Sequence, residues 1–554
     1  MPRHRLLTVW AVLAVAALCA RLGGFPLLDP DEGRNAEVGR EMALTNDYVM
    51  PRLDGLPYLD KPIVYFAAEA AAMEVLGPTE TAARLPALLF TFAMAGAAFW
   101  FSRCTLCAPT GRGAQRAPAE PWLAFIATLA SPLTIAFSRT VIFDSALSFF
   151  ITVALMGFYF AVESGGRAAA VIAWMAIGFG VITKGPVAIA VPLLVAIPFA
   201  GRKIGRLFPI LGLALFAAVI APWLWAISRA VPDFLHYVLV VETTQRLTTG
   251  ALKRTGPPWY FIPYLLGGAL PWTFVLFGGK LDFRDRRILY LLLWIAVPLL
   301  FFSLSQSKRP QYILPLMPAV ALLVARVWCE ARRGTRIAAA AMALLGAACI
   351  AALRYVQLRD EFAAGARATA ISFGLCALAG GVVAFVFVNR RWISFVALSF
   401  PMLATPLCAN PLMNGLALRR STKALMAHVP PDAEVIGIEA FTGSMAFYLR
   451  RPIVVVTPDA EEFTSNYLIR HYDEFAGTPT LQRPSYLDAA LARRAAFIVR
   501  DSDDANRAKL AARGARLAAV GAHYAIYTMT RGQETGNRGQ MEHQPVPRPL
   551  SPVP

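Results

Sequence analysis

Apolar runs long enough to cross a bilayer follow one another along most of this 554-residue chain. A transmembrane helix needs roughly 18–23 predominantly apolar residues. By that measure the chain offers about thirteen candidate spans, at residues 6–28, 85–102, 121–138, 143–162, 168–183, 186–200, 207–228, 259–279, 288–304, 312–330, 336–353, 367–388 and 392–410. Charged residues make up only 16% of the chain, against about a quarter in soluble domains. These features predict a mainly α fold, a polytopic transmembrane helical bundle.

The first run could also be a secretory signal, because Arg3 and Arg5 precede it and small residues follow at 17–20. It continues to Leu28 and further spans follow, so we interpret it as a retained helix with a cytoplasmic N-terminus. In this orientation nearly every short inward loop is basic, which is the positive-inside pattern. The net charge of +18 is therefore largely explained by topology rather than by a nucleic-acid surface.

Composition changes near the end of the chain. Residues 421–530 alternate short β-like runs with helical pieces rich in Ala, Arg and Leu, as in a small soluble α/β domain. The last residues are rich in Pro, Gln and Gly, a composition typical of disorder. We predict a transmembrane domain over 1–410, a periplasmic α/β domain over 411–530 and a disordered tail over 531–554.

The segment DPDEGRNAEVGREM follows the first span, and half of its residues are charged. Asp29 can cap a helix whose first turn holds a proline, Asp31 and Glu32, a strong helix-start pattern. Later charges are spaced for i,i+3 and i,i+4 pairing, which predicts an amphipathic helix at the outer membrane rim. Glu37 and Glu41 suit a solvated helix face where acids only pair, whereas Asp31 and Glu32 are candidates for chemistry.

A second charged stretch, LPYLDKPIVYF, places Asp60 and Lys61 where an apolar run begins. A lysine beside aromatic residues could snorkel to lipid headgroups, or it could bind a phosphate as a point charge. More polar side chains occur at span ends on the same outward side: Arg139, Asp144, Lys184, Glu242, Arg246, Lys308, Arg309 and Tyr312. Charges gathered on one face of a membrane bundle usually line a functional cavity.

An ordered set of motifs lies within residues 1–410: DEGRNAEVGREM, DKP, RTVIFD, KGPVAIAVPL, PDFLHYVLVVETTQR…PPWYFIPYLLGGALPW and SQSKRPQYILPLMPAVALL. Through these motifs the chain resembles bacterial GT-C membrane glycosyltransferases, above all the 4-amino-4-deoxy-L-arabinose lipid A transferase (ArnT) group, which is related to protein O-mannosyltransferases. The resemblance implies a GT-C bundle and a sugar donor linked to undecaprenyl phosphate. It also implies transfer to lipid A on the periplasmic face of the inner membrane.

Two positions depart from the family pattern. Asn35 stands where the first motif commonly has Tyr, and Thr243 follows Glu242 where the family commonly has His or Asn. These departures weaken the substrate assignment more than the reaction class. The donor carries no diphosphate, so the chemistry requires no divalent metal or other cofactor; Asp60 is the residue that could ligate a metal.

The implied reaction assigns roles to these residues. The sugar's leaving group is a phosphate monoester anion, which cations near a low-dielectric rim stabilise; Lys61 and Arg246, with Tyr312 as a hydroxyl donor, are the predicted phosphate ligands. Attack from the opposite face of the sugar predicts inversion. A carboxylate takes the acceptor's proton if the acceptor is a hydroxyl, or orients it if it is a phosphate. Asp31 is the first candidate, Glu32 the second, and Asp144 a support. Secondary candidates are Asp60, Arg139, Lys184, Glu242, Lys308 and Arg309.

Other functions stay open on the sequence. A related polyprenyl-phosphate-sugar transferase could act on another lipid, a glycan or a protein. A secondary transporter would show internal repeats and charges at mid-membrane depth, and we find no repeat. A non-catalytic membrane scaffold with a periplasmic binding domain is the third alternative.

Overall fold

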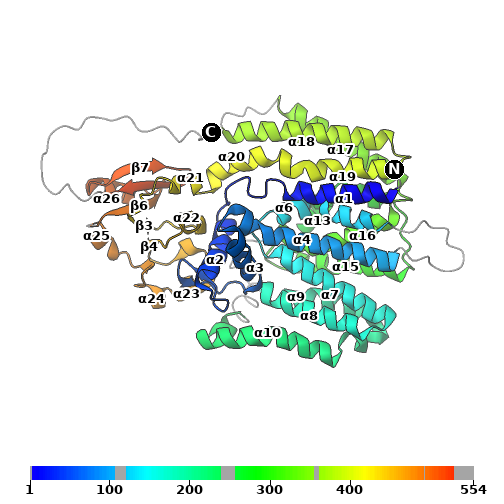
Figure 1. Ribbon diagram of the computed structural model, residues 1–554, viewed down its shortest axis with the longest axis horizontal. Helices are drawn as coiled ribbons and strands as arrows, with labels where there is room; N and C mark the ends of the chain where they lie inside the picture. The colour runs from blue at the N-terminus through cyan, green and yellow to red at the C-terminus, as the bar shows by residue number, and fades with distance from the viewer. Residues whose placement is uncertain (1–2, 107–119, 239–255, 355–360, 492, 530–554) are drawn as a thin grey trace.

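The computed structural model describes residues 3–106, 120–238, 256–354, 361–491 and 493–529. Long helices lie side by side and form a bundle, and a sheet domain lies at one end of it (Figure 1). The N-terminus lies at the opposite end of the bundle (Figure 1). The predicted disordered tail, 531–554, lies outside the described residues.

Ten helical segments among the described residues are long and apolar enough to span a membrane. Their main helices are α4 (Glu80–Phe101), α7 (Asp144–Ser164), α8 (Arg167–Lys184), α9 (Val187–Ala200), α10 (Ile210–Ala230), α15 (Arg286–Leu304), α16 (Met317–Val327), α17 (Arg332–Ala352), α18 (Glu361–Val386) and α19 (Arg391–Cys408). A bent pair, α5 (Pro121–Leu129) and α6 (Pro132–Ser138), forms an eleventh span if its two halves are counted together across their 63° bend. The prediction of a multi-pass helical membrane protein is confirmed.

The described residues hold fewer full-length spans than the predicted thirteen or so. The first run forms α1 (Arg3–Cys19), which is shorter than expected, because Arg21 adopts a left-handed backbone conformation (φ 51°) soon after it. The run at 259–279 divides into α13 (Phe261–Gly268) and α14 (Trp272–Phe277). Pro271 separates them, because it lacks the N–H that would continue the helical hydrogen bonds.

The basic loops meet at the end of the bundle that holds the N-terminus. A guanidinium nitrogen of Arg287 donates to the backbone carbonyl of Thr105 at 2.8 Å. A guanidinium nitrogen of Arg206 donates to the carbonyl of Val162, also at 2.8 Å. Positive charge therefore gathers at one end of the bundle, and the sheet domain lies at the other.

Between the bundle and the sheet domain lie α2 (Asp31–Thr45) and α3 (Val64–Leu76) (Figure 1), connected through a short hairpin of β1 (Arg52–Leu53) and β2 (Leu56–Pro57). The expected solvated face of α2 is wrong, because the helix is covered on nearly all sides. Glu37 pairs with Arg40 at 2.7 Å as predicted, but both are buried. Burial raises the pKa of Glu37 to about 8 in spite of this partner.

The predicted capping role of Asp29 is also wrong. Pro30 occupies the N-cap position of α2 and no side chain caps the helix. The Asp29 carboxylate instead accepts hydrogen bonds from the hydroxyl and the backbone N–H of Ser444. A contact across more than four hundred residues leaves no local pattern, so the sequence favoured the nearby helix end.

Six strands form the sheet of the C-terminal domain, in the order β5-β4-β3-β6-β8-β7. They are β3 (Glu434–Ile438), β4 (Val454–Val456), β5 (Leu481–Gln482), β6 (Ala495–Arg500), β7 (Arg516–Val520) and β8 (Tyr524–Thr528). The first four strands in this order are parallel to one another, and β8 runs antiparallel to both of its neighbours, β6 and β7. The predicted small sheet domain is therefore present.

The two faces of the sheet belong to different cores, since alternate residues of a strand point to opposite sides. Val435 and Ile498 pack in one core with Ala36 of α2, whereas Ile436 and Phe497 pack in a separate core on the other face. The domain is thus joined to the membrane part by apolar packing, not only by the chain connection.

Candidate functional site

Two adjoining cavities lie where the bundle meets α2 and the sheet domain. One is largely apolar, with a volume of about 220 Å³. The other is polar, with a volume of about 100 Å³. Their shared boundary consists of Asp60, Lys61, Asp144, Lys184 and Tyr312. Five residues singled out on the sequence therefore meet at one place.

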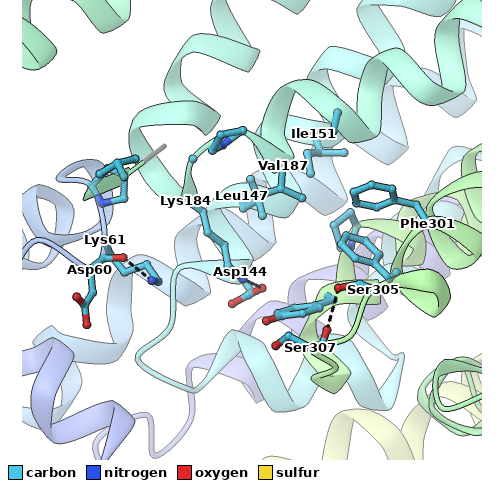
Figure 2. Close-up of a pocket in the computed structure, with 18 of the residues that line it drawn as sticks. Asp60, Lys61, Asp144, Leu147, Ile151, Lys184, Val187, Phe301, Ser305 and Ser307 are labelled. Atoms are coloured by element: carbon cyan, nitrogen blue, oxygen red, sulfur yellow. Dashed lines mark hydrogen bonds and ion pairs between the residues drawn. The ribbon is translucent and has the colours of Figure 1, made fainter. Parts of the chain in front are cut away.

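The apolar cavity takes its walls mainly from α7, the start of α9 and the end of α15. Figure 2 shows Leu147, Ile151, Val187 and Phe301 around it, with Ser305 at its polar side. These positions are apolar because each helix presents them to the bundle interior rather than to water. The cavity can therefore hold a hydrocarbon chain, whose transfer from water is favourable.

An ion pair between Asp144 and Lys184 stands at the boundary (Figure 2). Asp144 is the first residue of α7 and Lys184 is the last residue of α8. Each charge is favoured at its helix end by the helix dipole. The Lys184 ammonium also lies 4.9 Å from the centre of the Tyr312 ring. The two cavities thus share a fixed positive charge with an aromatic hydroxyl nearby.

Lys61 approaches the same boundary from the loop before α3 (Figure 2), and its ammonium donates to the backbone carbonyl of Asp60. The Asp60 carboxylate accepts from the Tyr237 hydroxyl at 2.6 Å and from the backbone N–H of Asn466 at 3.0 Å. These contacts turn Asp60 towards the sheet domain. Among the described residues, no group of three His, Cys, Asp or Glu side chains is placed to hold a metal ion.

Asp31 lies between two arginines in the polar cavity. Its Oδ1 accepts from Arg34 at 2.7 Å and its Oδ2 accepts from Arg309 at 2.9 Å. Burial raises the pKa of Asp31, but the two guanidinium groups outweigh it and hold the pKa below its usual value. Asp31 is therefore an ionised carboxylate whose two oxygens already accept from guanidinium groups.

Glu32, the second catalytic candidate, lines neither cavity. Its carboxylate forms a buried ion pair with Arg84 at 2.8 Å and accepts from the backbone N–H of Val141 at 3.1 Å. The next residue along a helix points about 100° away, so adjacent acids reach different surroundings. Asp31 faces the polar cavity, whereas Glu32 connects α2 to the bundle.

The remaining candidates divide into two groups. Arg139 donates to the backbone carbonyls of Leu18 and Arg21, and Lys308 donates to that of Ser305; neither lines the two cavities. Glu242 and Arg246 lie outside the described residues.

Arg34, Thr464 and Asn466 are among the cavity residues that were missed on the sequence. Arg34 could have been found, because it follows Asp31 by three positions on one helix. Thr464 and Asn466 line the polar cavity from the sheet domain, and nothing in the sequence around them indicates this.

The chain is similar to curated proteins that share one name. It is 31% identical over 392 residues to the undecaprenyl phosphate-alpha-4-amino-4-deoxy-L-arabinose arabinosyl transferase of Aeromonas salmonicida (strain A449), a match that covers 66% of this chain and 70% of that protein. The protein of the same name from Yersinia pestis (strain Pestoides F) is 28% identical over 470 residues, covering 79% of this chain and 83% of that protein. The match to the one from Aeromonas hydrophila subsp. hydrophila, at 32% identity, covers 54% of this chain and 56% of that protein. No family model matches the chain.

The fold is that of two solved structures. The crystal structure of ArnT from Cupriavidus metallidurans bound to undecaprenyl phosphate superposes with a TM-score of 0.82 at 22% identity, covering 96% of this chain and 99% of that one. The apo structure of the same protein gives 0.80 at 23% identity, with coverages of 94% and 97%. The arrangement of bundle and sheet domain is therefore shared with that fold.

The different surroundings of Asp31 and Glu32 generate a prediction. Glu32→Gln leaves the buried Arg84 without its charged partner, so we expect a loss of about 3–5 kcal/mol in the free energy of unfolding. Asp31→Asn changes a partly exposed group and should keep the melting temperature close to that of the parent while reducing transfer. Thermal unfolding in detergent measures both. Equal stability of the two variants would contradict these assignments.

Proposed function

Because the chain belongs to the undecaprenyl phosphate-alpha-4-amino-4-deoxy-L-arabinose arabinosyl transferase family, we propose that it transfers 4-amino-4-deoxy-L-arabinose from undecaprenyl phosphate to a phosphate of lipid A. The carrying observation is that two lysines, Lys61 and Lys184, lie at the boundary between an apolar and a polar cavity. The donor has a hydrocarbon part and a phosphosugar part, so it needs an apolar cavity and a polar cavity that meet at its phosphate.

The donor phosphate lies at this boundary, with its first isoprenoid units in the apolar cavity. Lys61 and Lys184 supply positive charge there, and the Tyr312 hydroxyl can donate a hydrogen bond. As the bond from the sugar carbon to the phosphate oxygen breaks, negative charge grows on that oxygen. Fixed cations in a site of low dielectric stabilise this charge most strongly. Arg246, predicted from the sequence as a further ligand, belongs to the same proposal.

The acceptor enters the polar cavity, where Arg34 and Arg309 form a paired binding site for a phosphate. Arginine suits this role because its planar fork matches phosphate oxygens. A phosphate monoester already carries an anionic oxygen at neutral pH, since its second pKa is about 6. It therefore attacks the sugar without losing a proton to the enzyme. Attack from the side opposite the leaving phosphate inverts the sugar carbon.

The role of Asp31 follows from its contacts. With both oxygens engaged by arginines and a lowered pKa, it is a poor base, so a hydroxyl acceptor would find no ready proton acceptor there. Asp31 instead holds the two guanidinium groups at the spacing that a phosphate requires. In the same way, Asp144 holds the ammonium group of Lys184 in position. These contacts favour lipid A phosphate over a hydroxyl of a glycan or protein.

We place the two cavities at the periplasmic face of the bacterial inner membrane. The basic loops gather at the end of the bundle away from the cavities, and such loops stay in the cytoplasm. An alkaline phosphatase fused after residue 420 should therefore be active, because it folds only outside the cytoplasm. An inactive fusion, together with a fluorescent cytosolic reporter at the same point, would reverse this orientation.

The function itself is tested on whole cells. We expect a bacterium that makes the aminoarabinose donor but lacks its own transferase to gain lipid A species heavier by one aminopentose when it expresses this protein. Mass spectrometry of lipid A, with cells that carry the empty vector as the negative control and the Asp31→Asn protein as the impaired variant, measures the change. An unchanged lipid A mass with normal protein levels would rule out this donor and acceptor pair.

The donor site is tested with purified protein. Lys61→Gln should raise the KM for undecaprenyl-phosphate-sugar by roughly 10- to 100-fold, because a hydrogen bond to a charged group contributes about 1.5–3 kcal/mol. Lys61→Arg keeps the charge and should retain partial activity. The matched control is Lys280→Gln, in a basic loop at the other end of the bundle. If Lys61→Gln leaves the KM for the donor unchanged, Lys61 does not bind the phosphate, and Lys184 and Tyr312 would be its remaining ligands at the boundary.

A further inference from the structure

A loop of the sheet domain reaches into the polar cavity. It runs from the single turn η5 (Glu461–Phe463) into the start of the short helix α23 (Asn466–Arg470), and its Thr464 and Asn466 line the cavity. The polar cavity is therefore assembled from the membrane part and the soluble domain together.

Thr464 is hydrogen-bonded to Arg34, an arginine of the proposed acceptor site. Its Oγ1 accepts a hydrogen bond from Nη1 of Arg34 at 2.6 Å, while Nη2 of Arg34 donates to Asp31 at 2.7 Å. The Arg34 Nε is buried and makes no hydrogen bond to the described residues. Thr464 and Asp31 thus each accept a hydrogen bond from a different terminal nitrogen of Arg34, and together they fix the orientation of its guanidinium group.

The backbone of Thr464 is held in an unfavourable conformation. Its φ of 52° lies in the left-handed region, which a β-branched residue rarely adopts. Such strain costs about 1–3 kcal/mol and persists where the surrounding structure imposes it, often at functional sites. Glycine would fit this conformation without strain. A threonine there indicates that the side chain, rather than the turn, is what the position requires.

The same loop also holds the segment that carries Lys61. The backbone N–H groups of Asn466 and Tyr467 donate to Asp60 at 3.0 and 3.3 Å. Asp60 directly precedes Lys61, whose ammonium donates to the Asp60 carbonyl. One loop of the sheet domain therefore contacts both the acceptor arginine and the donor-phosphate segment.

The sheet domain packs very closely against α2 near Arg34. A Cβ on Gly443 would lie 2.4 Å from the Cα of Arg34, and a Cβ on Gly33 would lie 2.5 Å from the backbone nitrogen of Ser444. The two backbones can approach this closely only because both residues are glycine. The sheet domain, through the start of its helix α22 (Gly443–Leu449), is thus in close backbone contact with α2 next to Arg34.

We propose that Thr464 is a positioning residue of the transferase, whose hydroxyl orients Arg34 to receive the acceptor phosphate. The inference rests on the proposed function and extends it by making the soluble domain a part of the acceptor site. It predicts that loss of this hydroxyl weakens the use of the acceptor and leaves the use of the donor unchanged.

The test uses three substitutions in the full-length protein, with steady-state kinetics on undecaprenyl-phosphate-aminoarabinose and lipid A. Thr464→Val keeps the branched shape without the hydroxyl and should raise the KM for lipid A about tenfold, with the donor KM unchanged. Thr464→Ser keeps the hydroxyl and should behave like the parent. Thr464→Gly removes the hydroxyl and relieves the backbone strain, so it should be fully stable and still show the raised acceptor KM.

Two further comparisons separate positioning from general damage. Ser502→Ala removes a hydroxyl from an exposed turn of the same domain and should change neither KM. In an Arg34→Gln background, Thr464→Val should cause no additional loss, because the group it positions is already gone. An additional loss of the same size in that background would overturn the role through Arg34.

The same experiments show whether the role of Thr464 fails alone or the proposed function fails as well. If the parent protein transfers the sugar to lipid A and stable Thr464→Val and Thr464→Gly proteins match it in acceptor KM, the inference is wrong and the function stands. If the parent protein transfers nothing to lipid A, the proposed function fails, and the acceptor role of Thr464 fails with it.

Discussion

The ion pair between Asp144 and Lys184 lies where a hydrocarbon-lined cavity meets a polar one, and the arrangement of the site depends on that boundary. A charged lysine at the edge of a membrane bundle is costly unless a partner compensates it. Asp144 supplies the compensation without leaving the boundary. The positive charge can then remain beside the apolar wall, where a lipid phosphate must lie for its hydrocarbon to be buried. Lys61 and Tyr312 belong to the same boundary.

The same rule of compensated charge explains α2. Asp31 is held by Arg34 and Arg309, and Glu32 by Arg84. Glu37 also contacts Arg40, but burial raises its pKa to about 8, which favours the uncharged acid at neutral pH. A helix with so many charges could not lie between a membrane bundle and a sheet domain if they were unpaired, because burying an isolated charge is strongly unfavourable. Pairing allows it to form part of the wall of the polar cavity, which Asp31 and Arg34 line. It also leaves Asp31 unsuited to take a proton, which is why the site favours an acceptor that has none to lose.

Sequence reasoning predicted the parts of this site that depend on local pattern and missed those that depend on distant contacts. The apolar runs predicted the helical bundle, and the charges at span ends identified Asp144, Lys184 and Lys61 at the boundary. Periodicity alone could not separate Asp31 from Glu32, since either could have faced the cavity until the neighbours of α2 were known. Asp29 was assigned to the nearest helix end because its partner Ser444 is remote in sequence. Thr464 carried no signal at all, because its backbone conformation and its contact with Arg34 arise only from the docking of two distant parts of the chain.

Our main inference is that the acceptor group is a phosphate rather than a hydroxyl. It is tested most directly by offering the purified protein the aminoarabinose donor with two acceptors, lipid A and the same lipid A stripped enzymatically of its phosphates, which keeps its sugar hydroxyls. We expect transfer to the phosphorylated lipid and none above background to the stripped one, with inorganic phosphate acting as a weak competitive inhibitor towards lipid A. Transfer to the stripped lipid at a comparable rate would mean that a hydroxyl attacks, and the roles given to Asp31, Arg34 and Arg309 would be wrong.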